Sequence, residues 1–134
     1  MEIVDAEGQV MGRVASIVSK LLVVGENVTV INSEKAIVSG KPQITFTFYA
    51  ERLTKGDVHH GPFPQRAPNL IFRNAVRGML PKTPRGRDAF RRLKVYNDNP
   101  TGKQGKKLVK TGKNLRARYV TLREISKNID KGGK

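Results

Sequence analysis

The sequence predicts an α/β fold with parallel strands, because its first 32 residues follow the pattern strand, helix, strand. Glu2–Asp5 and Asn27–Asn32 are short runs with β-branched apolar residues, which are typical of strands. Between them, Val10–Leu22 carries apolar residues on one helical face and polar residues on the other, and Gly25 is a typical residue after a helix end. In a unit of this kind the two strands are parallel and the connection between them is right-handed.

The segment after this unit predicts a short helix, a strand and a long loop. Ser33–Ser39 begins with a typical N-cap residue and is followed by the helix-breaking residues Gly40 and Pro42. Gln43–Tyr49 alternates between apolar and polar residues, which predicts a strand with one better-buried face. Residues 51–68 contain three Pro and two Gly, and a loop of this length in a compact domain is usually functional or disordered.

Two basic helices are predicted next. Asn69–Leu80 has an apolar face at helical spacing, and Pro81 ends it. Thr83 is a typical N-cap for a second, shorter helix, which leads to a strand at Lys94–Tyr96. From Asn69 to Lys94 there are eight Lys or Arg and one acid. The apolar face of the first basic helix consists of Ile71, Phe72, Ala75, Val76 and Met79.

The remainder of the chain predicts an extended basic arm and a short terminal helix. Residues 97–113 are rich in turn-forming residues and lysine. Thr121 and Glu124 have the spacing of a capping box, which opens a helix. We therefore expect one domain over residues 1–134, with an α/β body and basic helices over 1–100 and the arm and short helix over 101–134.

The charge of the chain is strongly positive and uneven. The formal net charge is +15, and residues 1–50 hold four Lys or Arg against five acids, whereas residues 51–134 hold 22 against six. Between Pro68 and Arg123 the acids are Asp88 and Asp98, although a surface adapted only for solubility mixes both signs. This distribution favours a polyanionic partner, and we expect nucleic acid.

The aromatic content favours recognition of phosphate and shape over stacking on bases. Aromatic residues make up 6% of the chain, and Phe72 and Phe90 stand at positions expected to face the core. Gly78 has two interpretations: it permits close approach of a phosphate backbone beside Arg77, or it only weakens the last helical turn.

Several other classes of site lack the residues they need. The chain has no cysteine, so disulfides, thiolate metal sites and cysteine nucleophiles are excluded. The phosphate-binding pattern GxxxxGK[ST] does not occur, and Gly8–Gly12 is interpreted as a turn into the first helix. Adjacent His59 and His60 are poorly placed to share a metal, so we expect no metal and no cofactor. The N-terminus has no apolar signal region and no run is long enough to span a bilayer, so a cytosolic protein is expected.

The segment AVRGMLPKTPRGRDAFRRLKVY (Ala75–Tyr96) closely resembles the large-subunit ribosomal protein thirteen family. The RGMLPK core, the spacing to Gly86 and the RLKVY ending occur in that family in this order, and the resemblance extends over about residues 1–100. Asn97–Pro100 stands where bacterial members have an HPH-like segment, and this resembles the archaeal and eukaryotic branch, an archaeal source being preferred.

The resemblance implies a three-layer α/β/α fold around a four-stranded parallel sheet. It also implies a structural, non-enzymatic component of the large ribosomal subunit, located on the ribosome in the cytoplasm. Such a protein binds the large-subunit rRNA early in assembly, lies beside neighbouring ribosomal proteins, and has no membrane or small-molecule partner.

The residues expected to bind rRNA are the basic side chains and histidines of the loop, the helix pair and the arm. They are His59, His60, Arg66, Arg73, Arg77, Lys82, Arg85, Arg87, Arg91, Arg92, Lys94, Lys103, Lys106 and Lys107.

Two alternatives belong to other classes. An RNA-processing enzyme would use His59 and His60 in a basic cleft. A DNA-binding protein would use the two short helices around Pro81 as a helix-turn-helix, although the short link and the parallel sheet argue against it.

Overall fold

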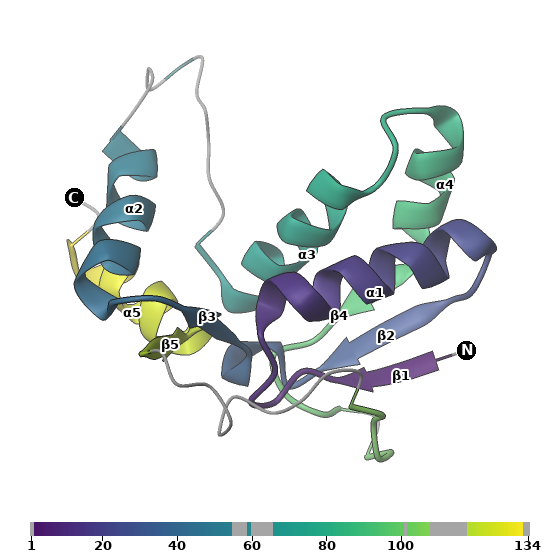
Figure 1. The fold of residues 1–134 in the computed structure, drawn as a ribbon, viewed down its shortest axis with the longest axis horizontal. Coiled ribbons are helices and arrows are strands. Elements are labelled where there is room, and N and C mark those ends of the chain that lie inside the picture. The colour runs from purple at the N-terminus through teal and green to yellow at the C-terminus, as the bar shows by residue number, and fades with distance from the viewer. Residues whose placement is uncertain (1, 55–58, 60–65, 101, 108–117, 133–134) are drawn as a thin grey trace.

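The strand–helix–strand unit predicted at the N-terminus is present, and it belongs to a parallel sheet. The computed structural model describes residues 2–54, 59, 66–100, 102–107 and 118–132. Strands β1 (Glu2–Asp5), β2 (Val28–Ile31) and β4 (Leu93–Val95) form a parallel sheet in the order β1-β2-β4 (Figure 1). Helix α1 (Met11–Val24) connects β1 to β2, and the predicted strand near Lys94 is confirmed as β4.

One face of this sheet is covered by helices and holds most of the core. Val4, Val30 and Val95 are in register on neighbouring strands, and each is buried. Helix α3 (Pro68–Met79) packs against α1, and helix α4 (Pro84–Arg91) packs against α1 and β4. Figure 1 shows these three helices on the same side of the sheet, as expected when both crossovers are right-handed and run in the same direction.

The expected four-stranded parallel sheet is wrong, because the remaining strands form a separate antiparallel pair. β3 (Ile37–Ser39) pairs with β5 (Tyr119–Thr121), so that Ile37 lies opposite Thr121. The parallel sheet therefore has three strands, and in the described part of the chain its second face carries no helical layer that would complete a three-layer fold. The fold class is α/β, with a second, smaller unit beside the parallel sheet.

The helix expected over Ser33–Ser39 is shorter than predicted. A single 3-10 turn, η1 (Ser33–Lys35), ends at Ala36, whose backbone is extended. The β-branched residues that follow then pair as strand β3, where Ile37 donates its backbone N–H to the Gln9 carbonyl at 2.9 Å. Tertiary pairing thus overrides the helix-start signal at Ser33.

The strand expected over Gln43–Tyr49 is wrong, because this segment lies within helix α2 (Pro42–Thr54). Pro42 stands at the first helical position, where proline is favoured. Thr47 donates its hydroxyl to the Gln43 carbonyl four residues earlier, at 2.8 Å. Phe46 and Tyr49 pack partly against the core, as neighbours three residues apart on a helix do.

The predicted terminal helix is confirmed as α5 (Leu122–Gly132), which packs against α2. Glu124 donates its backbone N–H to Thr121 Oγ1 at 3.2 Å, and Thr121 donates its own to Glu124 Oε2 at 3.2 Å. This is the predicted capping box. The helix buries Leu122, Ile125 and Ile129 on one side, as expected.

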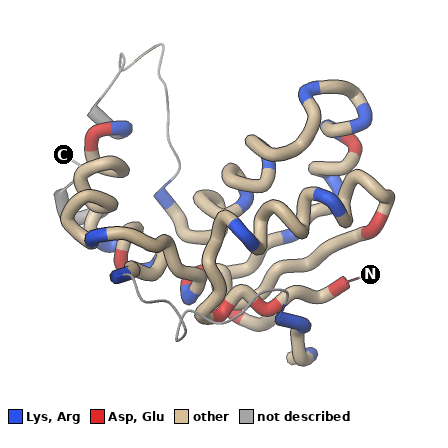
Figure 2. The backbone as a smooth tube through the Cα atoms, viewed as in Figure 1, with Lys and Arg blue, Asp and Glu red and all other residues tan. Residues whose placement is uncertain are grey.

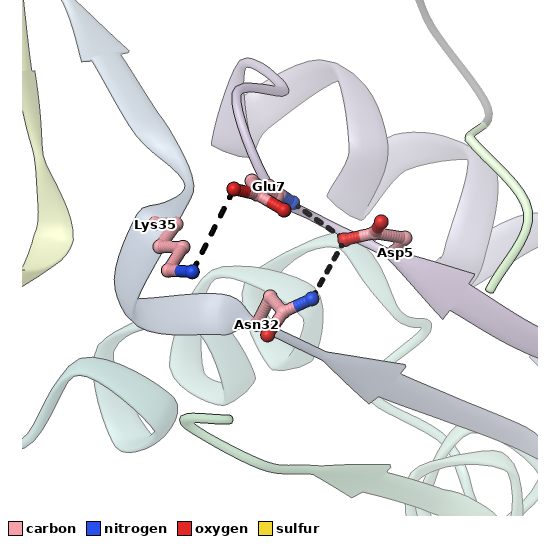
Figure 3. A network of polar contacts seen from close by, with 4 residues as sticks. All are labelled: Asp5, Glu7, Asn32 and Lys35. Carbon is pink, nitrogen blue, oxygen red and sulfur yellow. Dashed lines mark hydrogen bonds and ion pairs between the residues drawn. The ribbon is translucent and has the colours of Figure 1, made fainter. Parts of the chain in front are cut away.

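A polar network closes the corner at the carboxyl ends of β1 and β2 (Figure 3). Asp5 Oδ1 accepts hydrogen bonds from the Glu7 backbone N–H at 3.0 Å and from Asn32 Nδ2 at 3.1 Å. Lys35 Nζ lies 3.6 Å from Glu7 Oε1. Parallel sheets often bind ligands at this edge, but here the polar atoms bond to one another and shape the turn into α1. The interpretation of Gly8–Gly12 as a turn is therefore confirmed.

Candidate nucleic-acid interface

Helices α3 and α4 form a basic hairpin, and the short link between them depends on Thr83 and Gly86. The Gly86 backbone N–H donates to Thr83 Oγ1 at 3.4 Å, so the predicted N-cap is confirmed. A Cβ built at Gly86 would overlap the Pro81 carbonyl oxygen and lie 2.8 Å from the carbonyl carbon. The link is therefore packed against the first turn of α4 so closely that only glycine fits.

The apolar face of α3 is confirmed except at its last residue. Ile71, Phe72 and Val76 are buried, whereas Met79 is 45% exposed. The helix ends at Met79, and the extended residue Leu80 turns inward instead and is 6% exposed. The expected core position of Met79 is therefore wrong.

Six of the predicted cations lie exposed on the hairpin and on the strand that follows it: Arg77, Lys82, Arg85, Arg87, Arg91 and Lys94. Among the described residues, the acid that pairs with one of them is Asp88, whose Oδ1 lies 3.5 Å from Arg91 Nη1. Both side chains of that pair are exposed, and surface pairs of this kind neutralise little charge and contribute about 0–1 kcal/mol. The hairpin therefore presents a nearly uncompensated positive surface.

Two residues predicted to bind RNA also contact the end of α1. Arg92 donates to the Leu22 carbonyl at 2.5 Å, and Arg85 donates to the Val23 carbonyl at 3.3 Å. The last carbonyls of a helix have no partner within it and carry partial negative charge, so cations there are stabilising. These two guanidinium groups attach α4 to α1, and this structural role was not visible in the sequence.

Phe90 is only half buried and lies beneath two arginines of α3. The guanidinium carbon of Arg73 is 4.5 Å from the centroid of the Phe90 ring, and that of Arg77 is 5.9 Å from it. Both distances are within the range of cation–π attraction. The expected core position of Phe90 is therefore correct only in part, since its ring also supports charged side chains at the surface.

The described part of the basic arm lies at the other edge of the parallel sheet. Lys106 donates its backbone N–H to the Ile3 carbonyl at 2.9 Å and accepts from the Asp5 N–H at 3.0 Å, which adds it to the edge of β1. Gly105 allows this approach, because a Cβ there would lie 2.8 Å from the Asp5 nitrogen. Lys103, Lys106 and Lys107 are exposed.

The hairpin and the arm thus form two separate basic surfaces. The hairpin leads into β4 and the arm lies beside β1, and these two strands are opposite edges of the sheet. Figure 2 shows Lys and Arg both along α3 and α4 and in the segment beside β1.

The loop before α3 is described only in part. His59 and Arg66 are exposed, and His60 lies outside the described residues. Within the described ranges, no group of three or more His, Cys, Asp or Glu could hold a metal ion, and no helix is long and apolar enough to cross a membrane.

Burial raises the pKa of Tyr49 on α2, and the nearby Arg52 charge partly offsets this.

One residue important for the hairpin was missed in the sequence. Asn97 Oδ1 accepts a hydrogen bond from the backbone N–H of Asn69 at 2.9 Å. This bond caps the start of α3, where the N-cap residue, Ala67, has no side chain that could do so. Ser33 donates its hydroxyl to the Tyr96 carbonyl at 2.9 Å and holds the same segment. In the sequence Asn97 belongs to a run of turn-forming residues, and no local signal links it to a helix that begins 29 positions earlier.

The fold and this surface define a class of small, strongly basic α/β proteins whose positive charge is concentrated on one helical hairpin and a neighbouring arm. Comparison with known proteins identifies the family within this class. The family model described as ribosomal protein L13 matches residues 1–102. The chain therefore belongs to the ribosomal protein L13 family, whose members are structural components of the ribosome and not enzymes.

Similar curated proteins are archaeal proteins named large ribosomal subunit protein uL13. The protein of Methanopyrus kandleri is 50% identical over 99 residues, which cover 73% of this chain and 62% of that protein, less than two thirds of its length. The protein of Archaeoglobus fulgidus is 40% identical over 134 residues, with 95% of this chain and 86% of the relative covered. That of Methanococcoides burtonii is 38% identical over 138 residues, with 96% and 97% covered. These relatives agree with the branch expected from the Asn97–Pro100 segment.

Proposed function

We propose that this protein is a structural component of the large ribosomal subunit that binds the large-subunit rRNA by neutralising its phosphates. The observation that carries the proposal is the uncompensated charge of the hairpin and the strand after it, where six exposed cations have one exposed ion-pair partner, Asp88, among the described residues. Membership in the L13 family supports the ribosomal setting. Arg77, Arg87 and Arg91 contact phosphate directly in this proposal.

The arm beside β1 provides a second RNA contact. Its three exposed lysines lie at the sheet edge opposite β4, so one straight RNA segment does not reach both surfaces without bending around the sheet. The protein therefore holds two stretches of rRNA together. His59, His60 and Arg66 add contacts ahead of α3.

The setting follows from the same proposal. The protein joins the subunit early in assembly in the cytoplasm, when the phosphates that it neutralises would otherwise repel one another, and it lies beside other large-subunit proteins. It needs no cofactor, membrane or small-molecule substrate for this role.

Salt dependence tests the proposal. If about eight phosphates are contacted, the logarithm of the association constant for an rRNA fragment falls against the logarithm of salt concentration with a slope of roughly −6 to −7. Sedimentation of native lysate in moderate salt should place the protein with the large subunit and release it at high salt. A slope near zero, or stronger binding to duplex DNA than to rRNA fragments, would contradict the proposal.

A further inference from the structure

The Phe90 ring extends from α4 toward α3 and contacts two arginines of the basic hairpin. It comes from α4, whereas Arg73 and Arg77 come from α3, at 4.5 Å and 5.9 Å from the ring centroid. These two arginines are four residues apart, so they are neighbours on the same helix face and repel each other. Within the described residues neither has an ion-pair partner that would offset this repulsion.

An aromatic ring can hold an arginine without removing its charge. A carboxylate would also fix the guanidinium group, but it would neutralise the charge that attracts phosphate. The face of a ring carries partial negative potential and attracts the cation, and the group remains a full positive charge with its N–H donors at the rim. Phe90 therefore orients two cations and leaves their charges available.

The fold fixes the ring in this position. Ala89 is fully buried beside it and Leu93 is buried in β4, so the end of α4 cannot rotate freely. Arg73 Nε is itself buried and has no hydrogen-bond partner in the described part of the chain. The guanidinium group thus contacts the ring, while its Nε has no protein acceptor among the described residues.

We propose that Phe90 is a positioning residue of the RNA-binding surface, which holds the Arg73 and Arg77 guanidinium groups in a fixed orientation toward the phosphates of the RNA backbone. This inference rests on the proposed function and adds to it a residue with no charge. Its effect on affinity comes from cations that are ordered before the RNA arrives, since less side-chain freedom is then lost on binding.

The test compares Phe90→Leu with a matched control. Phe48 on α2 lies beneath Arg52, whose guanidinium carbon is 5.5 Å from the ring centroid, so Phe48→Leu removes a similar contact away from the hairpin. Affinity for an rRNA fragment is measured by filter binding at several salt concentrations, with the melting temperature of each free protein. We expect Phe90→Leu to bind about tenfold more weakly. Phe48→Leu should bind as the wild type does, and Phe90→Tyr, which keeps the ring, should bind within about twofold of it.

A double-mutant cycle separates positioning from stability. When Arg73 and Arg77 are both replaced by alanine, adding Phe90→Leu should cause no further loss of affinity, because no arginine remains to be held. An equal further loss would overturn the inference and show a general effect on folding. Wild-type affinity of Phe90→Leu in an otherwise salt-dependent binder would overturn the inference alone. If wild-type binding does not depend on salt concentration, the proposed function is overturned as well.

Discussion

The two sides of α4 carry the same residue type and use it for different purposes. On the side that faces α1, the exposed Arg85 and the partly buried Arg92, which follows the last residue of α4, donate to the last carbonyls of α1. On the outer side, Arg87 and Arg91 are exposed, and within the described residues the ion-pair partner of Arg91 is the exposed Asp88. Arg91 and Arg92 are neighbours in the sequence, yet one belongs to the structure and the other to the surface. A count of positive charge therefore does not separate the cations that also support the fold from those that have no such contact.

The largest expected effect on stability comes from a change in the link between α3 and α4, which determines the orientation of α4. Gly86→Ala introduces a Cβ that overlaps the Pro81 carbonyl, so the free energy of unfolding should fall by roughly 3 kcal/mol. Urea denaturation measures this loss. Wild-type stability of the variant would show that the link can shift and that the orientation of α4 is not fixed.

Arg92→Ala directly tests the side that faces α1. It removes a hydrogen bond from a charged donor and the favourable cation at the end of α1, so stability should fall by about 2 kcal/mol. Arg91→Ala is the matched control, and its stability should lie within about 0.5 kcal/mol of the wild type. Equal losses in the two variants would remove the distinction between the two sides.

The outer surface is tested by Arg77→Ala and Arg91→Ala in rRNA binding. Each should reduce the steepness of the salt dependence by about one phosphate contact and weaken binding, while the melting temperature of the free protein stays near that of the wild type. A large drop in melting temperature without RNA would instead place these residues with Arg92.

Gly78→Ala should change stability less than Gly86→Ala or Arg92→Ala does, and in the opposite direction. Nothing lies within 4 Å of a Cβ at this exposed helical position, so alanine should stabilise the free protein by up to about 1 kcal/mol. If the glycine instead serves close approach of phosphate beside Arg77, the same variant binds rRNA more weakly. A gain of stability with unchanged affinity would favour the other interpretation, a glycine that only weakens the helix.

Elements with strong local signals were predictable from the sequence. Val10–Leu22 has a clear helical period, and Pro81 and Thr83 mark the ends of two helices, so α1, α3 and α4 appear where expected. The strand predicted for Gln43–Tyr49 was wrong because its apolar pattern fits a helix as well. Ile44 and Phe48 are four residues apart, so they share a face both in an alternating strand and in a helix. In the helix both are exposed, at 66% and 55%, which the alternating pattern did not indicate.

The strand pairs and the arginine contacts depend on residues far apart in the chain. Ile37 pairs with Thr121, and Arg92 reaches Leu22 across 70 positions, and neither relation leaves a local pattern. The basic surface as a class was predictable because charge is additive along the sequence. The division of its members between structural and exposed roles required the position of α1.

The β3–β5 pair has a consequence for how the chain is built. During synthesis the residues of β3 leave the ribosome long before those of β5. While the basic helices form, β3 therefore lacks its partner strand β5, and the inner face of α2 lacks α5. Contacts between residues so far apart in the sequence cost much conformational entropy and form slowly. We expect a nascent chain that stops before Tyr119 to hold the parallel sheet and leave α2 open to proteolysis.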